Sequence, residues 1–184
     1  MKDEQKKEAI QKAIIQQINE VGFVSVSMSK IAKSAGVSAS TLYIYYENKE
    51  DMFQKVYSEV KQAMLIACSN NLTSDQPVKK MIMKFCQNIL SFIQDNNDYF
   101  NFLEQAGTSP VMTPLSVRKD LAKRGKPVYD VFEKGISEGI LKKTDANLLI
   151  SFCMYPIAQI YKESSMTNVD FDVVFKMCWD AIKA

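Results

Sequence analysis

Apolar residues recur at helical spacing along most of the chain, with polar residues between them. The first such stripe repeats every three or four residues and has Lys and Glu on the opposite face. It consists of Ile10, Ile14, Ile18 and Val21. We therefore predict a helix from about Lys6 to Val21, ended by Gly22, because glycine readily adopts the conformation that follows a helix.

Good capping residues mark the starts of the next three helices. Ser27 and Ser38 each precede a short apolar pattern, and a serine oxygen can accept a bond from a free N–H group of the first turn. The helix after Ser38 is expected to turn Leu42 and Tyr46 inward, four residues apart. Asn48 is the expected cap of a fourth, longer helix.

The rest of the chain continues the helical pattern without a convincing strand. A fifth helix is expected after Ser74 or Asp75, with Pro77 in its first turn. Further helices are predicted over residues 99–105, 115–138, 145–163 and 170–183. The pattern therefore predicts an all-α fold of about nine helices.

The composition fits a folded helical protein. The 184 residues are 47% hydrophobic and 24% charged, with a net charge of +2, which excludes extensive disorder. Six Gly and five Pro are few for a fold rich in turns. The chain has no histidine, which excludes catalysis by a histidine base and removes the commonest metal ligand.

The four cysteines do not form a metal-binding pattern. Cys68, Cys86, Cys153 and Cys178 lie among apolar residues, and none belongs to a CxxC spacing. We expect them to be small buried hydrophobic residues in a reducing cytosol. No metal and no cofactor is predicted.

No segment has the pattern of a signal peptide or a membrane span. The charged N-terminus has no apolar h-region. The longest apolar run, residues 148–161, is interrupted by polar residues and is too short to cross a bilayer. We expect a soluble cytoplasmic protein with no membrane partner.

Two short helices joined by a tight turn with Gly36 form a predicted helix-turn-helix, braced by the first helix. The apolar residues that lock the two helices together leave an exposed face of small, hydroxyl and aromatic side chains. These are Ala39, Ser40, Thr41, Tyr43, Ile44 and Tyr45. Such a face suits the major groove of DNA, where a thin helix approaches the edges of the bases.

Residues 27–53, SMSKIAKSAGVSASTLYIYYENKEDMF, resemble the DNA-binding signature of the tetracycline-repressor (TetR) family of bacterial transcription regulators. The family pattern is a hydroxyl residue, then I-A, A-G-V-S, T-L-Y-x-[HY]-[FY] and K-E-x-[LM], and every part of it is present at its spacing. Tyr46 stands where Phe is usual, and Ala39 and Ser40 stand where Lys or Arg and Gly or Ala are common. The direct resemblance covers residues 6–60.

The resemblance implies a homodimeric, all-α regulator that is not an enzyme. Residues 1–48 would form the helix-turn-helix DNA-binding domain, and residues 49–184 a larger domain for ligand binding and dimerisation. The implied partners are double-stranded operator DNA of palindromic sequence, a second copy of the chain and a small apolar or amphipathic effector. Most members of the family are repressors that leave DNA when the effector binds.

The resemblance also indicates the residues that meet DNA. They are Ser27, Lys30, Ala39, Ser40, Thr41, Tyr43, Ile44, Tyr45 and Lys49. By the resemblance, Ser27, Tyr45 and Lys49 contact phosphate. Thr41, Tyr43 and Ile44 would meet bases or nearby phosphates. Residues 1–62 carry nine lysines and eight acids, so the attraction for DNA is local, around residues such as Lys30, and not a property of the net charge.

Two sets of residues in the second half are candidates for ligand binding and dimerisation. The ligand-pocket candidates are Met81, Phe85, Phe102, Tyr129, Phe152 and Tyr155, although aromatic and Met residues at helical spacing are more often plain core. A basic run from Arg118 to Lys126 could receive an acidic ligand or form a solvated face. The last two helices are expected to dimerise, because residues 148–161 are apolar nearly all round. The interface candidates are Ile157, Phe171, Val174, Phe175 and Cys178.

Two functions from different classes therefore stay open. The first is a ligand-responsive DNA-binding regulator. The second is a helical interaction protein that keeps the fold but has lost operator binding. An enzyme is disfavoured, because no catalytic constellation is apparent in a chain without histidine.

Overall fold

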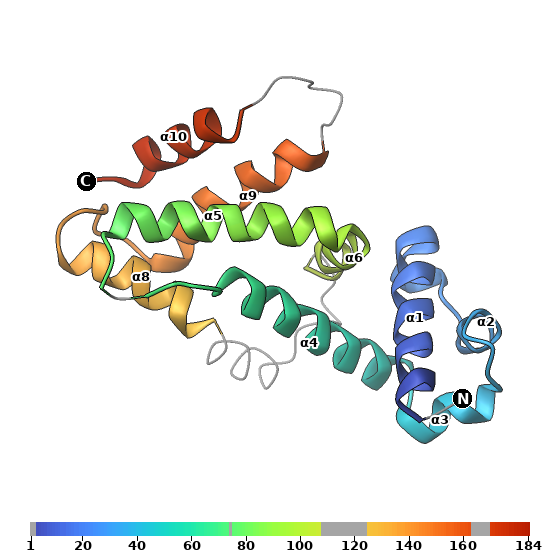
Figure 1. Cartoon of the computed structure of the whole chain (residues 1–184). Helices are drawn as coiled ribbons and strands as arrows, with labels where there is room; N and C mark the ends of the chain where they lie inside the picture. Colours follow the sequence, from blue (N-terminus) through green and yellow to red (C-terminus); the bar gives the residue numbers. More distant parts are fainter. Residues whose placement is uncertain (1–2, 74, 108–124, 163–169) are drawn as a thin grey trace. The chain divides into compact units, whose positions relative to one another are not determined.

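The computed structural model describes residues 3–73, 75–107, 125–162 and 170–184 (Figure 1). Within these ranges the chain forms nine α-helices, and its only β-type pairing is an isolated antiparallel bridge between Leu141 and Lys183. The predicted all-α fold is confirmed. No helix in these ranges is both long and apolar enough to cross a membrane.

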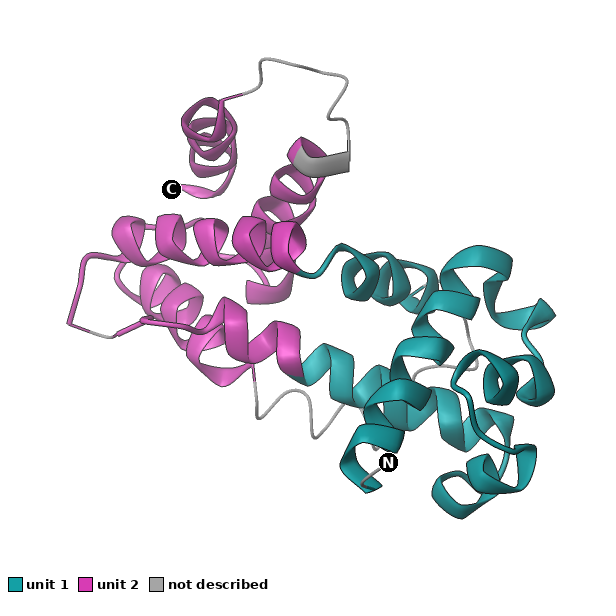
Figure 2. Cartoon of the chain, turned by 45° about the vertical axis from the view of Figure 1, so that its right-hand side comes forward, with its two compact units in different colours: residues 1–62, 96–121 teal, residues 63–95, 122–184 magenta. Residues whose placement is uncertain are grey.

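The chain divides into two compact units, each built from two separate stretches of sequence (Figure 2). Unit 1 comprises residues 1–62 and 96–121, and unit 2 comprises residues 63–95 and 122–184. This division differs from the functional boundary expected at residue 48, since helix α6, far along the chain, packs against α1 in unit 1. Helix α4 begins in unit 1 and ends in unit 2.

Unit 1 is arranged around its first helix. Its elements are α1 (Asp3–Ser25), α2 (Met28–Ser34), α3 (Ala39–Tyr45), the start of α4 (Lys49–Cys68) and α6 (Asn97–Gly107). Helix α1 packs against both α2 and α6, and α2 packs against α3 (Figure 1). The predicted stripe of α1 is buried at Ile10, Ile14 and Ile18, so the apolar periodicity identified the correct face.

Unit 2 is built on helix α5. Its helices are the end of α4, α5 (Val78–Asp95), α8 (Lys126–Ser137), α9 (Ala146–Lys162) and α10 (Phe171–Ile182). Helix α5 packs against α8, α9 and α10, and α9 also packs against α10 (Figure 1). The predicted apolar stripe of α5 from Val78 to Ile93 is buried, as expected for a helix that has neighbours on several sides.

Three predicted capping residues occupy their predicted places, but α5 begins at Val78, so Asp75 is not its cap and Pro77 precedes its first turn. Ser27 and Ser38 cap α2 and α3 with side-chain oxygens, and Asn48 Oδ1 accepts from the Asp51 amide at 2.8 Å at the start of α4. Asp170 caps α10 in the same way. Each of these helix starts is therefore fixed by a local hydrogen bond that the sequence itself specifies.

The bounds of α1 and α8 also differ from the prediction. Helix α1 extends from Asp3 to Ser25, with Gly22 as a non-helical residue inside it at φ 74° and ψ 164°. Gly22 therefore interrupts α1 as expected, but the chain resumes helical structure after it. Helix α8 begins at Lys126, and most of the region predicted as helix before it, from residue 115, lies outside the described residues.

Candidate functional site

The turn between α2 and α3 has the hydrogen bonds of a glycine-terminated helix. Ala35 is the C-cap of α2, and Gly36 follows with a φ of 67°. The Gly36 amide donates to the Lys33 carbonyl at 3.2 Å, and the Val37 amide donates to the Ala32 carbonyl at 3.0 Å. These are the two bonds of a Schellman motif, which ends one helix and fixes the direction of the next.

Helix α3 is anchored at its N-terminus by hydroxyl groups. Ser38 Oγ accepts from the Thr41 amide at 3.2 Å. The same oxygen lies 2.8 Å from the hydroxyls of both Ser40 and Thr41. On the inner face, Leu42 is fully buried. The hydroxyl cluster and Leu42 together determine which side of α3 faces solvent.

The outer face of α3 is open and uncharged. Ile44 is 78% exposed and Tyr43 57% exposed, and Ala39 and Ser40 are also exposed. No acidic or basic side chain occurs in the helix. Two large exposed apolar side chains on one seven-residue helix are unusual for a surface that meets only water, and they indicate a contact surface.

Two predicted phosphate contacts are engaged with the chain's own N-terminal helix. Tyr45 donates its hydroxyl proton to the Asp3 carboxylate, and this hydrogen bond raises the pKa of the Tyr45 phenol. Lys49 Nζ donates to the Val24 carbonyl at 3.3 Å and lies 5.4 Å from the centroid of the Phe53 ring. To bind phosphate, both side chains must leave these partners.

Two further predicted contacts lie at the start of α2, Ser27 as its N-cap and Lys30 in its first turn. Ser27 Oγ accepts from the Lys30 amide at 3.3 Å, so this serine acts as a cap in the free chain. The Lys30 side chain is exposed. The structure therefore brings the predicted DNA-contacting residues to unit 1, on α2, α3, the residue before α2 and the first residue of α4.

Tyr46 lies beneath α3 and carries a buried hydroxyl. Its side chain is only 3% exposed, and its hydroxyl has no hydrogen-bond partner among the described residues. Burial raises the pKa of Tyr46 to about 12, and the carboxylates of Glu59 and Asp51 add to this effect. The hydroxyl that distinguishes this residue from the usual phenylalanine is therefore desolvated without compensation.

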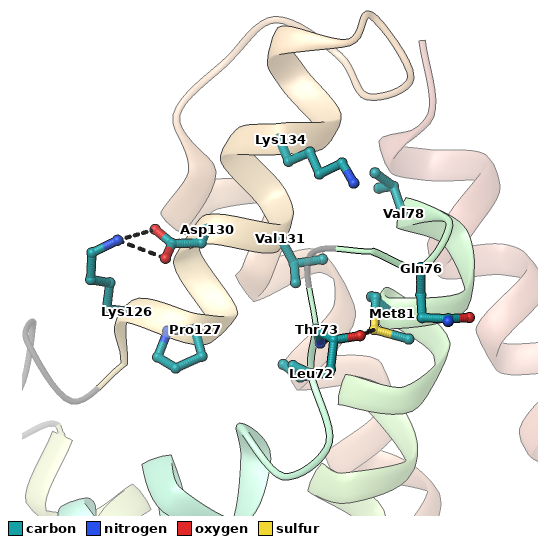
Figure 3. Close-up of a pocket in the computed structure, with 10 residues that line it drawn as sticks. All are labelled: Leu72, Thr73, Gln76, Val78, Met81, Lys126, Pro127, Asp130, Val131 and Lys134. Atoms are coloured by element: carbon teal, nitrogen blue, oxygen red, sulfur yellow. Dashed lines mark hydrogen bonds and ion pairs between the residues drawn. The ribbon is translucent and has the colours of Figure 1, made fainter.

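Unit 2 contains a cavity of about 480 Å³ between α8, the start of α5 and the segment that follows α4 (Figure 3). Its lining consists of Leu72, Thr73, Gln76, Val78, Met81, Lys126, Pro127, Asp130, Val131 and Lys134. Small-molecule sites commonly have volumes in this range and combine an apolar surface with a few polar groups. This cavity is a candidate ligand site.

The predicted pocket residues do not come together at this cavity, where only Met81 is found. Phe85 is buried in edge-to-face contact with Phe132, at 5.7 Å between ring centroids. Phe102 is buried in unit 1 beside Phe23. The other three candidates, Tyr129, Phe152 and Tyr155, lie on α8 and α9 outside the lining. The aromatic residues predicted for the pocket therefore lie in the core or on other parts of the surface, and not in the lining of this cavity.

The sequence reasoning missed most of the cavity lining. The basic run supplied one signal, since Lys126 belongs to it and lines the cavity. Arg118, Lys119, Lys123 and Arg124 of the same run lie outside the described residues. Lys134 and the segment from Leu72 to Gln76 have no periodic pattern that marks a pocket. These residues come together only because α8 packs against α5 in unit 2.

The residues predicted for the dimer interface require a correction. Four of the five are buried inside the protomer and have no surface to offer a partner: Ile157, Val174, Phe175 and Cys178. The reason is that α10 packs its stripe against α9 and α5 of the same chain. Phe171 is half-buried and lies parallel to Phe175, at 6.2 Å between ring centroids.

A different set of apolar residues is exposed on the last two helices. On α9 these are Leu148, Phe152 and Tyr155, and on α10 they are Val173 and Met177. The α9 residues are spaced i, i+4 and i+7, and the α10 residues i and i+4, so each set occupies one face of its helix. Phe152 is 49% exposed and Met177 67% exposed. We call these five residues the C-terminal apolar face.

The four cysteines are buried in unit 2. A hydrogen bond with Cys153 and burial raise the pKa of the Cys86 thiol, and burial raises the pKa of Cys178 to about 11. Thiols that stay protonated are poor nucleophiles and poor metal ligands. In the described part of the chain, no group of three or more Cys, Asp or Glu side chains is arranged to hold a metal ion.

Comparison with known families matches both halves of the chain. Residues 10–56 match the family described as bacterial regulatory proteins, tetR family. Residues 77–183 match the family described as tetracyclin repressor-like, C-terminal domain. The first match contains α2 and α3 with their turn, and the second contains the cavity-lining helices α5 and α8.

Individual proteins agree with these matches. An HTH-type transcriptional regulator of Haemophilus influenzae is 23% identical over 171 residues, which are 88% of this chain and 87% of the relative. The solved structure of a TetR family transcription regulator from Marinobacter aquaeolei has a TM-score of 0.88 at 24% identity, covering 98% of this chain and 97% of the other. The fold is therefore shared over nearly the whole length.

A more distant structure was solved with a ligand. The transcriptional regulator FadR from Bacillus subtilis, in complex with stearoyl-CoA, has a TM-score of 0.69 at 18% identity. The comparison covers 95% of this chain and 96% of FadR. At this identity the likeness concerns the fold alone.

Proposed function

The chain belongs to the tetR family of bacterial regulatory proteins, and we propose that it acts as a homodimeric repressor that leaves its palindromic operator when a small apolar or amphipathic effector binds. The observation that carries this proposal is the outer face of α3, where Tyr43 and Ile44 stand exposed beyond a Schellman turn. Such a protein acts by binding alone, without catalysis, and works on DNA in the cytoplasm.

The chemistry of α3 favours contacts with thymine. The helix has no Arg, Asn or Gln, so it cannot form the bidentate hydrogen bonds that read guanine or adenine. Ala39, Thr41 and Ile44 offer methyl groups, which suit the C5-methyl group of thymine. We expect operator half-sites in which a few thymines carry much of the discrimination.

Helix α4 is the proposed mechanical link between effector and DNA. It begins at Lys49, beside α3, and ends at Cys68 in unit 2. Its first part is held to α1 by an ion pair from Lys7 to Glu59 at 2.7 Å, and Gln11 donates to the same carboxylate at 3.2 Å. A ligand that moves the far end of α4 would shift Lys49 and α3, and with them the spacing of the two reading heads.

The C-terminal apolar face is the proposed dimer contact. A soluble monomer rarely leaves several large apolar side chains exposed in ordered rows on neighbouring helices. A second copy would cover both rows and give a four-helix interface between α9, α10 and their copies.

The bound stearoyl-CoA of FadR supports an amphipathic effector for this chain as well.

A mobility-shift assay with the upstream region of the chain's own gene tests DNA binding. We expect binding by the wild-type chain and loss of binding in Ile44→Asp, because a carboxylate on α3 would face phosphates. The control is Ile66→Asp, which places the same charge at an isoleucine of α4 that is 60% exposed. Absence of any shift with wild-type protein would favour the alternative, an interaction protein that has lost operator binding.

A further inference from the structure

The C-terminal end of α3 lacks the local residues that usually stabilise such an end. The last carbonyl groups of a helix have no partners within the helix and carry a partial negative charge. A basic residue in the last turn or a glycine after it commonly compensates for this. The last turn of α3 contains no basic residue, and Tyr46 follows it as an extended C-cap. A group outside α3 is therefore needed to hold this end.

Lys55 of α4 supplies the missing cation. Its Nζ donates to the carbonyl of Tyr45, the last residue of α3, at 3.3 Å. The same ammonium group lies 5.8 Å from the centroid of the Tyr46 ring, within the range of a cation–π contact. One side chain of α4 thus stabilises both the negative end of α3 and the residue that caps it.

Asp51 fixes Lys55 in this position. Asp51 Oδ2 lies 2.8 Å from Lys55 Nζ, and the two residues are one turn apart on α4. The same oxygen accepts from the Glu47 amide at 3.0 Å. Glu47 belongs to the three-residue link through which α3 leads directly into α4 (Figure 1). We call Asp51 and Lys55 the α3–α4 clamp, since together they hold the end of α3 and the link to the start of α4.

The clamp completes the set of contacts that orient α3. The cap Ser38 fixes the start of the helix, and the buried Leu42 fixes its inner face. The clamp fixes the far end, next to the exposed Tyr43 and Ile44. Contacts with base edges depend on the direction from which a side chain approaches, whereas the attraction between lysines and phosphates does not depend on base sequence. A change in the direction of α3 would therefore affect discrimination between sequences most.

We propose that Asp51 and Lys55 are positioning residues, which hold α3 in the orientation that fits a specific DNA sequence and do not contact DNA themselves. The proposal rests on the proposed function, since only a chain that binds DNA can discriminate between sequences. It also explains how α3 follows α4. Both clamp residues lie in the first two turns of α4, so a displacement of these turns is passed to α3 through the clamp as well as through the covalent link.

Fluorescence anisotropy with two duplexes of equal length and composition tests the positioning role. One duplex carries a sequence that the wild-type chain selects from a random pool, and the other carries the same bases in scrambled order. The variant is Lys55→Met, which keeps an apolar stem over Tyr46 and removes the donor. We expect about tenfold weaker binding to the selected duplex, because a dimer loses two clamps. Affinity for the scrambled duplex and the salt slope should not change.

Three further variants separate the clamp from a simple loss of charge. Lys55→Arg should retain discrimination, because a guanidinium can donate to the Tyr45 carbonyl and to Asp51 together. Asp51→Asn should lose part of it, and combining it with Lys55→Met should add no further loss, because both residues act through the same contact. The control is Lys143→Met, which removes an exposed lysine of unit 2 and should change neither affinity.

Amide hydrogen exchange of the full-length chain without DNA tests the clamp itself. The Tyr46 amide donates to the Leu42 carbonyl at 2.9 Å, and its exchange requires the end of α3 to open. In Lys55→Met we expect this amide to exchange several-fold faster, because local opening is easier when a stabilising contact is lost. Amides in the middle of α1, such as that of Ile14, should exchange as in the wild type.

Other results would overturn the proposal. Weaker binding of Lys55→Met to both duplexes, together with a lower salt slope, would show that Lys55 binds phosphate directly. Unchanged discrimination, or unchanged exchange of the Tyr46 amide, would also contradict the positioning role. Failure of the wild-type chain to select any sequence would contradict the proposed function instead, and the exchange experiment would still show whether the clamp holds α3.

Discussion

At the scale of single residues, the side chains expected to bind phosphate already have partners. Tyr45 is bonded to Asp3, and Lys49 is bonded to the Val24 carbonyl. Each would exchange a contact with α1 for a contact with DNA. These partners are exposed, and exposed pairs of this kind contribute little to stability, so the exchange costs little free energy and the residues remain available to DNA.

Lys49→Ala should therefore weaken binding to all DNA sequences alike. A phosphate contact releases condensed counterions, so its loss lowers the slope of log K against log salt by about one per subunit. Fluorescence anisotropy at several salt concentrations measures this slope, with Lys143→Ala as the control. A slope that Lys49→Ala leaves unchanged would contradict the assignment.

Tyr46 should make stability depend on alkaline pH. Its pKa is raised from 10.0 to about 12 in the folded chain, so the unfolded chain ionises first. Below pH 10 the Tyr46 phenol is neutral in both states, and its ionisation does not affect the free energy of unfolding. As the pH rises from 10 towards 12, ionisation in the unfolded chain lowers the free energy of unfolding by up to about 1.4 kcal/mol per pH unit.

Tyr46→Phe removes both this pH dependence and the cost of burying an unpaired hydroxyl. Below pH 10 we expect the variant to equal the wild type or to exceed it by up to about 1 kcal/mol. Above pH 10 its advantage should grow. Urea unfolding at pH 8 and at pH 11 measures the difference between the two proteins. Parallel loss of stability in both would show that other groups, such as lysines, account for the alkaline dependence.

At the scale of helices, the sequence predicted what local chemistry determines. The caps Ser27, Ser38 and Asn48 could be identified because each bonds an amide within three residues of itself. The extent of α1 could not, because nothing in the sequence says that the chain becomes helical again after Gly22. That outcome depends on packing, which places Phe23 against Phe53 and Phe102.

Gly36 provides a test of the turn that orients α3. A Cβ added there would meet no atom within 4 Å, yet the residue has a φ of 67°. Gly36→Ala should therefore cost about 1–2 kcal/mol for conformational reasons alone. That corresponds to a fall in melting temperature of roughly 2–8 °C for a chain of this size.

Gly107→Ala is the matched control for this substitution. A Cβ there also has open space, but the backbone is not in the left-handed region. The control should be neutral or slightly stabilising, because alanine restricts the unfolded chain. Equal melting temperatures for the two variants would show that the turn is not strained by a side chain at Gly36.

At the scale of the whole molecule, function depends on surfaces that no local pattern reveals. The sequence correctly indicated an exposed face on α3, because a seven-residue helix has few ways to bury Leu42. It did not indicate which apolar residues of α9 and α10 stay exposed. Ile157 and Phe152 are both large apolar residues of the run 148–161, and the sequence does not distinguish them. The packing of α9 against α5 and α10 buries Ile157 and leaves Phe152 exposed.

Dimerisation through the C-terminal apolar face predicts a difference between these two residues. Phe152→Glu should give folded monomers in light scattering, because a charge would be placed in the interface between copies. Ile157→Glu should instead unfold the chain, because the charge would be placed in the core. Ser91→Glu, at an exposed position of α5, should leave the dimer intact. A folded dimer of Phe152→Glu would place the interface elsewhere.

Selection of bound sequences from a random pool of double-stranded DNA tests the central claim most directly, because the pool contains every candidate operator. A dimer with two α3 helices predicts enrichment of a palindrome whose half-site centres lie about one helical turn apart, ~34–36 Å, or a multiple of it. The Ile44→Asp chain should enrich nothing. Recovery of no common sequence by the wild-type chain, or of one without two-fold symmetry, would contradict the account of a dimeric DNA-binding regulator.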